Sequence, residues 1–120
     1  MSVENKRRHT RVPITARVDI QFEDDERLCC ETRDLCLSGM LVCSGQHRTK
    51  GDPCQITFIT RNRPLRLRGE VARVDGGGMA LLFTDMNLRT YTSLQEVLLD
   101  NAENPFAVAE EFIDSLPADQ

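Results

Sequence analysis

The 120-residue sequence lacks any long apolar segment. Apolar clusters such as Val97-Leu98-Leu99 are far shorter than the roughly 20 residues that a membrane-spanning helix needs. The N-terminus leads from Lys6, Arg7 and Arg8 into an alternating pattern instead of the apolar core of a secretory signal. We therefore expect a cytoplasmic protein that does not insert into a membrane.

The sequence also lacks the cysteine spacing of a metal site. No two cysteines form a CxxC pair, and neither histidine stands at ligand spacing from them. The number of cysteines is odd, and thiols in the cytoplasm stay reduced. We expect no metal, no cofactor and no disulfide, with all five packed as small hydrophobic residues: Cys29, Cys30, Cys36, Cys43 and Cys54.

Basic residues are absent from the C-terminal part of the chain. No lysine or arginine follows Arg89, whereas seven acidic residues do. The first 89 residues carry 15 basic and 12 acidic groups, and the whole chain has a pI near 5.1. A binder of DNA or RNA normally shows a broad basic face and a high pI. The charge pattern favours a small anion as ligand over a polyanion.

Alternation of apolar and polar residues predicts a mainly β protein of one domain. The even positions from Val12 to Phe22 are apolar, and most odd positions between them are polar. Gly69 is expected to mark a bulge or bend. Six short strands with turn signals between them favour an antiparallel barrel or sandwich: Val12–Phe22, Arg27–Arg33, Met40–Ser44, Cys54–Thr60, Leu65–Val74 and Met79–Phe83.

The period changes after Phe83 and predicts two helices. The first spans Asn87–Asn101, with a capping-box pairing between Ser93 and Glu96. The second begins with Asn104 as N-cap and Pro105 in the first turn. It ends at Pro117, and its apolar face is expected to hold Phe106, Ala109, Ile113 and Leu116. We expect this acidic segment to supply a surface for a protein partner or a homodimer.

A basic arm, Lys6-Arg7-Arg8-His9-Thr10-Arg11, precedes the first strand. Guanidinium groups make bidentate contacts with phosphate and with the O6/N7 edge of guanine. A solvated N-terminus is the alternative reading of such a run. The arm alone does not decide between the two.

A second feature is the segment Asp34-Leu35-Cys36-Leu37-Ser38-Gly39 between two predicted strands. Asp34 could accept hydrogen bonds from the N1–H and N2–H edge of a guanine. Gly39 would supply a left-handed dihedral angle or let a ligand approach the backbone. The alternative is a strand turn in which Asp34 caps nearby backbone amides.

Together the two segments resemble the PilZ family of cyclic diguanylate receptors. Its pattern is RxxxR on an N-terminal arm, followed by [D/N]xSxxG between the second and third strands. Arg7 and Arg11 match the first motif, with Arg8 inside it, and Asp34 and Gly39 match the ends of the second. The resemblance implies a six-stranded PilZ-type barrel with C-terminal helices. It divides the chain into an arm (1–11), a barrel (12–84) and a helical segment (85–120).

The resemblance further implies a non-enzymatic receptor that orders its arm on the barrel and relays the signal to an unknown protein partner. The ligand-binding residues would be Arg7, Arg8, Arg11, Asp34, Cys36 and Gly39, with Lys6 and Ser38 as weaker candidates. The long fifth strand carries Arg66, Arg68 and Arg73; one of them is a further candidate for the ligand face, and the alternative is that all three are simply exposed. The family is bacterial and linked to motility, surface polysaccharide and virulence, and this sequence does not select among them.

Cys36 departs from the family pattern, because serine is the residue of the motif. A thiol is a weak hydrogen-bonding group, so binding would weaken by roughly 0.5–1.5 kcal/mol unless Ser38 supplies the hydroxyl. The competing reading is a degenerate PilZ-type adaptor that does not bind the nucleotide. An enzyme or redox protein is disfavoured because no nucleophile–base set is recognisable. Lys6 either helps hold a second, stacked nucleotide or is simply solvated.

Overall fold

The computed structural model describes residues 10–44, 48–59 and 64–114. These ranges contain seven strands and two helices, and the protein is mainly β as predicted. The strands are β1 (Val12–Pro13), β2 (Arg17–Phe22), β3 (Arg27–Leu35), β4 (Gly39–Cys43), β5 (Pro53–Phe58), β6 (Leu65–Asp75) and β7 (Gly78–Asp85). The helices are α2 (Leu88–Asn101) and α3 (Pro105–Asp114).

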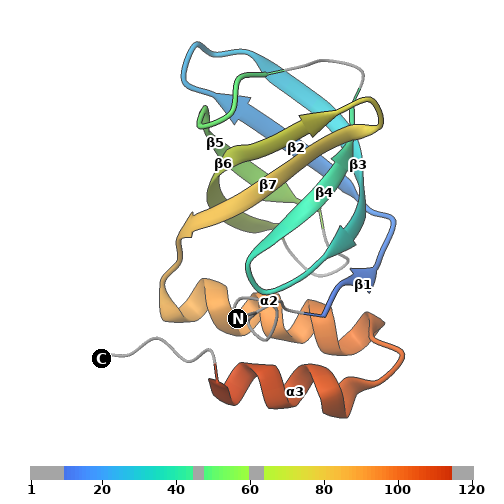
Figure 1. The fold of residues 1–120 in the computed structure, drawn as a ribbon. Coiled ribbons are helices and arrows are strands. Elements are labelled where there is room, and N and C mark those ends of the chain that lie inside the picture. Colours follow the sequence, from blue (N-terminus) through green and yellow to red (C-terminus); the bar gives the residue numbers. More distant parts are fainter. Residues whose placement is uncertain (1–9, 45–47, 60–63, 115–120) are drawn as a thin grey trace, which may run out of the picture.

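Six strands close into an antiparallel barrel (Figure 1). The strand order is β1-β3-β2-β5-β6-β7-β4, and an additional pairing of β4 with β3 closes strands β2 to β7 into a ring, beside which the short β1 pairs with β3. Closure leaves β2 to β7 without a free long edge. The predicted six-stranded barrel is therefore confirmed, and the expected bulge at Gly69 is present as a register shift between Arg68 and Gly69.

The first predicted strand, Val12–Phe22, is wrong as a single element. It is divided into β1 and β2 by residues 14–16, at which point the chain moves from one end of β3 toward the other. The buried Thr32 of β3 stabilises this break: its hydroxyl donates to the Ile14 carbonyl at 2.9 Å and accepts from the Ala16 amide at 3.2 Å. A buried break needs such partners for its backbone groups.

The barrel interior is filled by the inward residues of every strand. Val18, Ile20 and Phe22 of β2 are buried, as the alternation predicted. They pack with the buried side chains of the neighbouring strands, among them Leu28, Leu35, Val42, Ile56, Phe58, Leu67, Val71, Met79 and Leu81. The outward residues of the same strands are therefore free to form binding surfaces.

Arg48 closes the end of the barrel farther from the helices. Its guanidinium lies 4.0 Å from the centre of the Phe22 ring. It forms ion pairs with Asp24 at 3.2 Å, with Asp52 at 3.3 Å and with Glu26. The Glu26 amide and the Arg48 guanidinium together lower the pKa of the Asp24 carboxyl.

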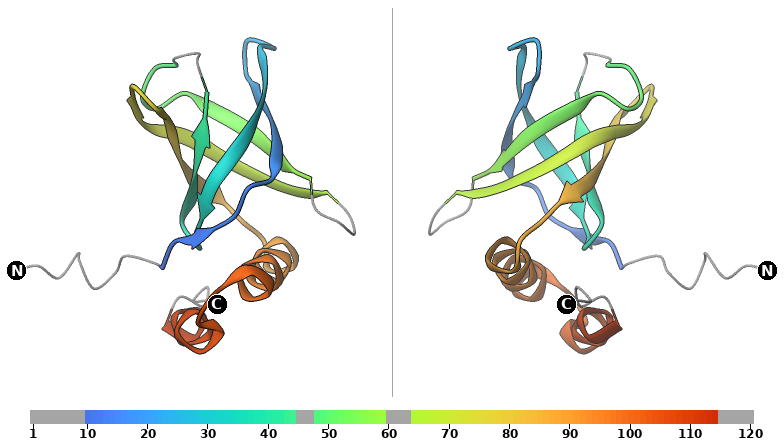
Figure 2. Two further views of the ribbon diagram at one scale, coloured as in Figure 1. Left: turned by 90° about the vertical axis from the view of Figure 1, so that its right-hand side faces the viewer. Right: turned by 90° about the vertical axis from the view of Figure 1, so that its left-hand side faces the viewer.

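Helix α2 lies across the other end of the barrel (Figures 1 and 2). Asn87 is its N-cap, and the Asn87 side-chain oxygen accepts from the Thr90 amide at 2.8 Å. The predicted limits are therefore right to within one residue, but the predicted capping box is wrong, because Ser93 and Glu96 lie inside the helix rather than at its start. Tyr91, Leu94 and Leu98 are buried.

Helix α3 packs beside α2, and its start was predicted correctly: Asn104 accepts from the Ala107 amide at 3.3 Å. The predicted apolar face is wrong. Phe106 and Ile113 are 85% and 72% exposed, whereas Val108 and Phe112 are buried. Because α3 carries apolar residues on two faces, its contact with α2 decides which of them is covered. Leu116 and Pro117 lie outside the described residues.

Neither helix is long and apolar enough to span a membrane; this finding covers the described residues.

Candidate functional site

Asp34 reaches the outside of the barrel through a bulge in β3. Thr32 pairs with Val42 and Asp34 pairs with Leu41, so Arg33 is an extra residue between the two pairs. Before the bulge the even positions of β3 face inward, and strict alternation would also bury position 34. The bulge reverses the alternation, which leaves Asp34 half-buried on the outer wall and Leu35 in the core.

A tight hairpin then connects β3 to β4. The Cys36 amide donates to the Gly39 carbonyl at 2.9 Å, with Leu37 and Ser38 at the tip. The Cys36 Sγ lies 3.3 Å from the Ser38 Oγ, so the thiol and the hydroxyl share one side of the hairpin. The Ser38 carbonyl accepts from the Phe83 amide at 2.8 Å, which fixes the hairpin to β7.

Gly39 is required by the neighbouring strand. A Cβ at this position would lie 2.1 Å from the Leu81 carbonyl oxygen. Gly39 is not among the residues with positive φ, so the expected left-handed dihedral angle is wrong. The space that the missing side chain leaves is taken by the backbone of β7.

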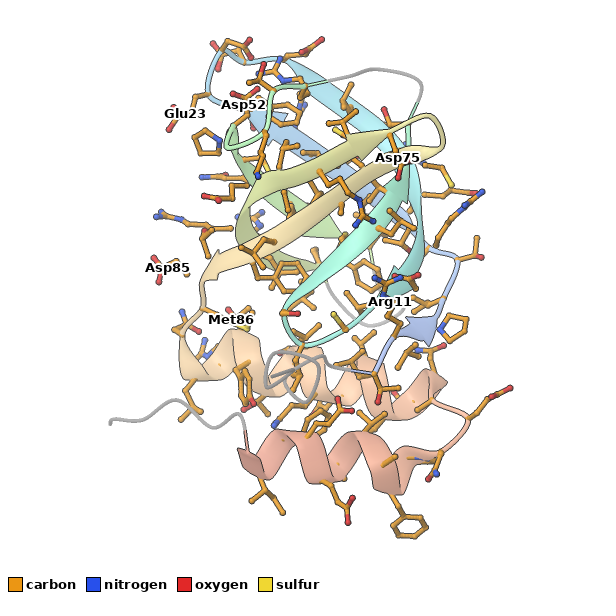
Figure 3. The ribbon with its side chains drawn as sticks, viewed as in Figure 1. Arg11, Glu23, Asp52, Asp75, Asp85 and Met86 are labelled. Atoms are coloured by element: carbon orange, nitrogen blue, oxygen red, sulfur yellow. The ribbon has the colours of Figure 1, made fainter. Side chains whose placement is uncertain are left out.

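The outer wall of the barrel holds an open pocket of about 160 Å³ where these residues meet. It brings together five predicted site residues from two motifs: Arg11, Asp34, Cys36, Ser38 and Gly39. Leu41, Ala80 and Leu82 contribute apolar surface to the same pocket. Figure 3 shows Arg11 next to β1, on the opposite side of the barrel from Asp85. A guanidinium and a carboxylate beside an apolar floor form a site suited to a flat, polar ring.

The remaining predicted site residues, Lys6, Arg7 and Arg8, lie outside the described residues. The chain enters the described part at Thr10, whose amide donates to both carboxylate oxygens of Glu111 at 3.0 Å. The Thr10 hydroxyl also bonds to Glu111. This contact between the arm and α3 was not predicted, because residues 101 positions apart give no local signal.

Arg73 of β6 also lines the pocket and belongs to neither motif. The other two arginines of this strand, Arg66 and Arg68, line a separate groove of about 640 Å³ with Arg27 and Asp85. The sequence marked all three as candidates without separating them. Their positions on the barrel now do so.

The described residues contain no group of three or more histidine, cysteine, aspartate or glutamate side chains that could hold a metal ion. Cys54 is buried, Cys30, Cys36 and Cys43 are partly buried and Cys29 is exposed, so the expectation that all five cysteines are packed is wrong for Cys29. Burial raises the pKa of the Cys30 and Cys54 thiols to about 11. Thiols with such values are poor nucleophiles at neutral pH. Cys36 is the one cysteine that lines the pocket.

Structural comparison shows the same fold in several solved proteins. The chain matches the PilZ domain of CeSA from a cellulose-synthesizing bacterium with a TM-score of 0.66 and 21% identity, over 76% of this chain and 96% of that one. It matches the PilZ domain with c-di-GMP of YcgR from Escherichia coli with a TM-score of 0.67 and 14% identity, over 91% and 98% of the two chains.

A third structure is the PlzA protein of Borreliella burgdorferi in complex with c-di-GMP. It matches with a TM-score of 0.60 and 16% identity, over 79% of this chain and 42% of that one. No curated protein sequence matches this chain. The family model of the PilZ domain matches residues 5–100, which include both motifs and the whole barrel. The chain therefore belongs to the PilZ family, a family of receptors for cyclic diguanylate (c-di-GMP).

Proposed function

We propose that this protein is a non-enzymatic receptor that binds c-di-GMP on the outer wall formed by β3, β4, β6 and β7. The observation that carries the proposal is the shared pocket of Arg11 and Asp34, which come from the two separate motifs. Asp34 accepts hydrogen bonds from the N1–H and N2–H groups of a guanine. These two donors need acceptor atoms, which the carboxylate oxygens of Asp34 supply. Arg11 binds phosphate or the O6/N7 edge.

The arm (1–11) supplies the remaining cations, Arg7 and Arg8. Fixing six residues of a chain costs on the order of 1–2 kcal/mol each. A hydrogen bond to a charged group contributes roughly 1.5–3 kcal/mol, and a guanidinium that makes two such bonds contributes roughly 3–6 kcal/mol, so two or three bidentate arginines are needed to offset a cost of about 6–12 kcal/mol. The ligand thus clasps the arm against the barrel (12–84), and a protein partner reads the new surface together with the helical segment (85–120). We place this receptor in the cytoplasm.

Isothermal titration with c-di-GMP, with GTP as control, tests the proposal. Saturable binding of c-di-GMP and no binding of GTP is the expected result. The stoichiometry of the wild type and of Lys6→Ala then shows whether Lys6 holds a second nucleotide. Slower cleavage by trypsin after Arg7 and Arg8 in the presence of ligand is expected if the arm is clasped.

One observation favours a second function, an adaptor that binds a protein and not the nucleotide. Cys36 lines the pocket at the position where the family motif has serine. An absence of heat with c-di-GMP, in a protein that unfolds cooperatively, would support the adaptor. Restoration of binding by Cys36→Ser would then show that the thiol is the cause.

A further inference from the structure

Arg73 faces the pocket because of a second bulge, in β6. Val71 pairs with Leu81 and Arg73 pairs with Ala80, so Ala72 is an extra residue. Before this bulge the inward residues of β6 are odd-numbered, and strict alternation would aim position 73 into the core. The extra residue reverses the alternation. Val74 packs against the core instead, and Arg73 is exposed on the outer wall.

Arg73 and Asp34 lie in one row across the wall. Arg73 pairs with Ala80, Ala80 pairs with Leu41, and Leu41 pairs with Asp34. Strands lie about 4.8 Å apart, so roughly 14 Å separate the Cα atoms of Arg73 and Asp34. The two residues between them are apolar. The row therefore presents a carboxylate, an apolar floor and a guanidinium in that order.

Among the described residues, the guanidinium of Arg73 has a single ion pair, and both of its members are exposed. Its nearest described carboxylate is Asp75, at 3.8 Å from the Arg73 Nε, and the two side chains are 60% and 57% exposed. Ion pairs of this kind contribute little to stability. Arg73 can therefore turn toward a ligand at the loss of only this weak ion pair.

We propose that Arg73 binds the half of c-di-GMP that lies away from Asp34, through the O6 and N7 atoms of the second guanine. This inference rests on the proposed function. Guanine presents two acceptors on that edge, which match the paired donors of a guanidinium. Adenine presents a donor in place of O6, so Arg73 would also select guanine over adenine at this position.

The test is a set of calorimetric titrations with c-di-GMP on the wild type, Arg73→Ala, Arg73→Lys and the control Arg68→Ala. Arg68 is an exposed arginine of the same strand that lines the other groove. We expect at least tenfold weaker binding for Arg73→Ala, a smaller loss for Arg73→Lys and no change for Arg68→Ala. All four proteins should have the same thermal unfolding midpoint.

A second readout separates contact with guanine from a general effect of charge. The mixed ligand cyclic GMP–AMP carries one adenine, and the wild type should prefer c-di-GMP over it. Arg73→Ala should lose most of that preference, whereas an unchanged ratio would overturn the assignment to the guanine edge. If the wild type binds c-di-GMP and Arg73→Ala binds as tightly as Arg68→Ala, the inference fails and the proposed function stands. Absence of binding to the wild type overturns both.

Discussion

Gly39 makes room for the carbonyl oxygen of Leu81, which would lie only 2.1 Å from a Cβ at this position. The contact is between the backbones of β4 and β7, which pair through Gly39 and Leu82. Backbone atoms of two paired strands cannot move apart without loss of ladder hydrogen bonds. The glycine that ends the second motif therefore serves closure of the barrel, whatever else it does for the ligand.

Gly39→Ala should accordingly destabilise the protein. Overpacking of a tight site costs about 1–3 kcal/mol, and a contact with backbone places this variant at the upper end or above. Urea denaturation measures the change. Gly76→Ala is the matched control, because a Cβ on Gly76 meets nothing within 4 Å. Equal stability of the two variants would contradict the structural role of Gly39.

Arg11→Ala should remove most of the affinity for c-di-GMP. A charge-assisted hydrogen bond contributes roughly 1.5–3 kcal/mol, which corresponds to a loss of about ten- to more than a hundredfold. Calorimetry measures it, with Arg17→Ala as a control, since Arg17 is exposed on β2 and does not line the pocket. Unchanged affinity of Arg11→Ala would rule out the mechanism proposed above.

Cys36→Ser should strengthen binding by about three- to tenfold, because a hydroxyl gains a hydrogen bond of roughly 0.5–1.5 kcal/mol that a thiol makes poorly. The Ser38 Oγ lies 3.3 Å from the Cys36 Sγ, so the new hydroxyl would also be held in place. Cys29→Ser, on the outer face of β3, controls for the chemical change alone. Weaker binding by Cys36→Ser would show that the site is adapted to the thiol.

Much of this site could be predicted from the sequence because it is local. Asp34, Cys36, Ser38 and Gly39 lie in six consecutive residues, and their hairpin follows from a strand pattern interrupted at a glycine. The prediction that this hairpin and the arm form one site was based on the family resemblance and not on periodicity. The family match over residues 5–100 confirms that resemblance.

The parts that could not be predicted depend on tertiary contacts. Bulges at Arg33 and Ala72 carry no glycine or proline signal, yet they decide which face of the barrel receives Asp34 and Arg73. The break in the first strand depends on Thr32, which is at least 16 residues away from the backbone that it bonds. The covered face of α3 depends on α2. None of these contacts leaves a periodic trace.

The ion pairs of Arg48 with Asp24, Glu26 and Asp52 should make the stability of the protein depend on pH in the acid range. The pKa of Asp24 is lowered from 3.8 in the folded state, so its contribution is present above pH 3.8 and is lost as the pH falls through the folded value. In Arg48→Met the pKa of Asp24 is lowered less, because the guanidinium beside it is gone. The difference in unfolding free energy between the wild type and Arg48→Met should therefore narrow below pH 3.8. Arg89→Met, at an exposed position of α2, is the control, and its unfolding free energy should differ from that of the wild type by the same amount at every pH. A difference for Arg48→Met that also does not change with pH would contradict this account.

The thiols should differ in reactivity. Cys29 is exposed, whereas Cys54 is buried and burial raises its pKa to about 11. At pH 8 a thiol of that pKa is roughly one part in a thousand thiolate. Timed alkylation with mass spectrometry should label Cys29 long before Cys54 in the folded protein. In urea the two rates should converge, and equal rates in the folded protein would contradict the placement of Cys54.

The most direct test of the central claim is chemical-shift mapping of the labelled protein during titration with c-di-GMP. The ligand is expected on the wall of β3, β4, β6 and β7, so the largest shifts should fall on Arg11, Asp34, Leu41, Ala80 and Arg73. The chemical shifts of amides in the separate groove lined by Arg66 and Arg68, such as those of Gln21 and Gln55, should remain unchanged. Shifts confined to that groove, or an unchanged spectrum at saturating ligand, would contradict the account.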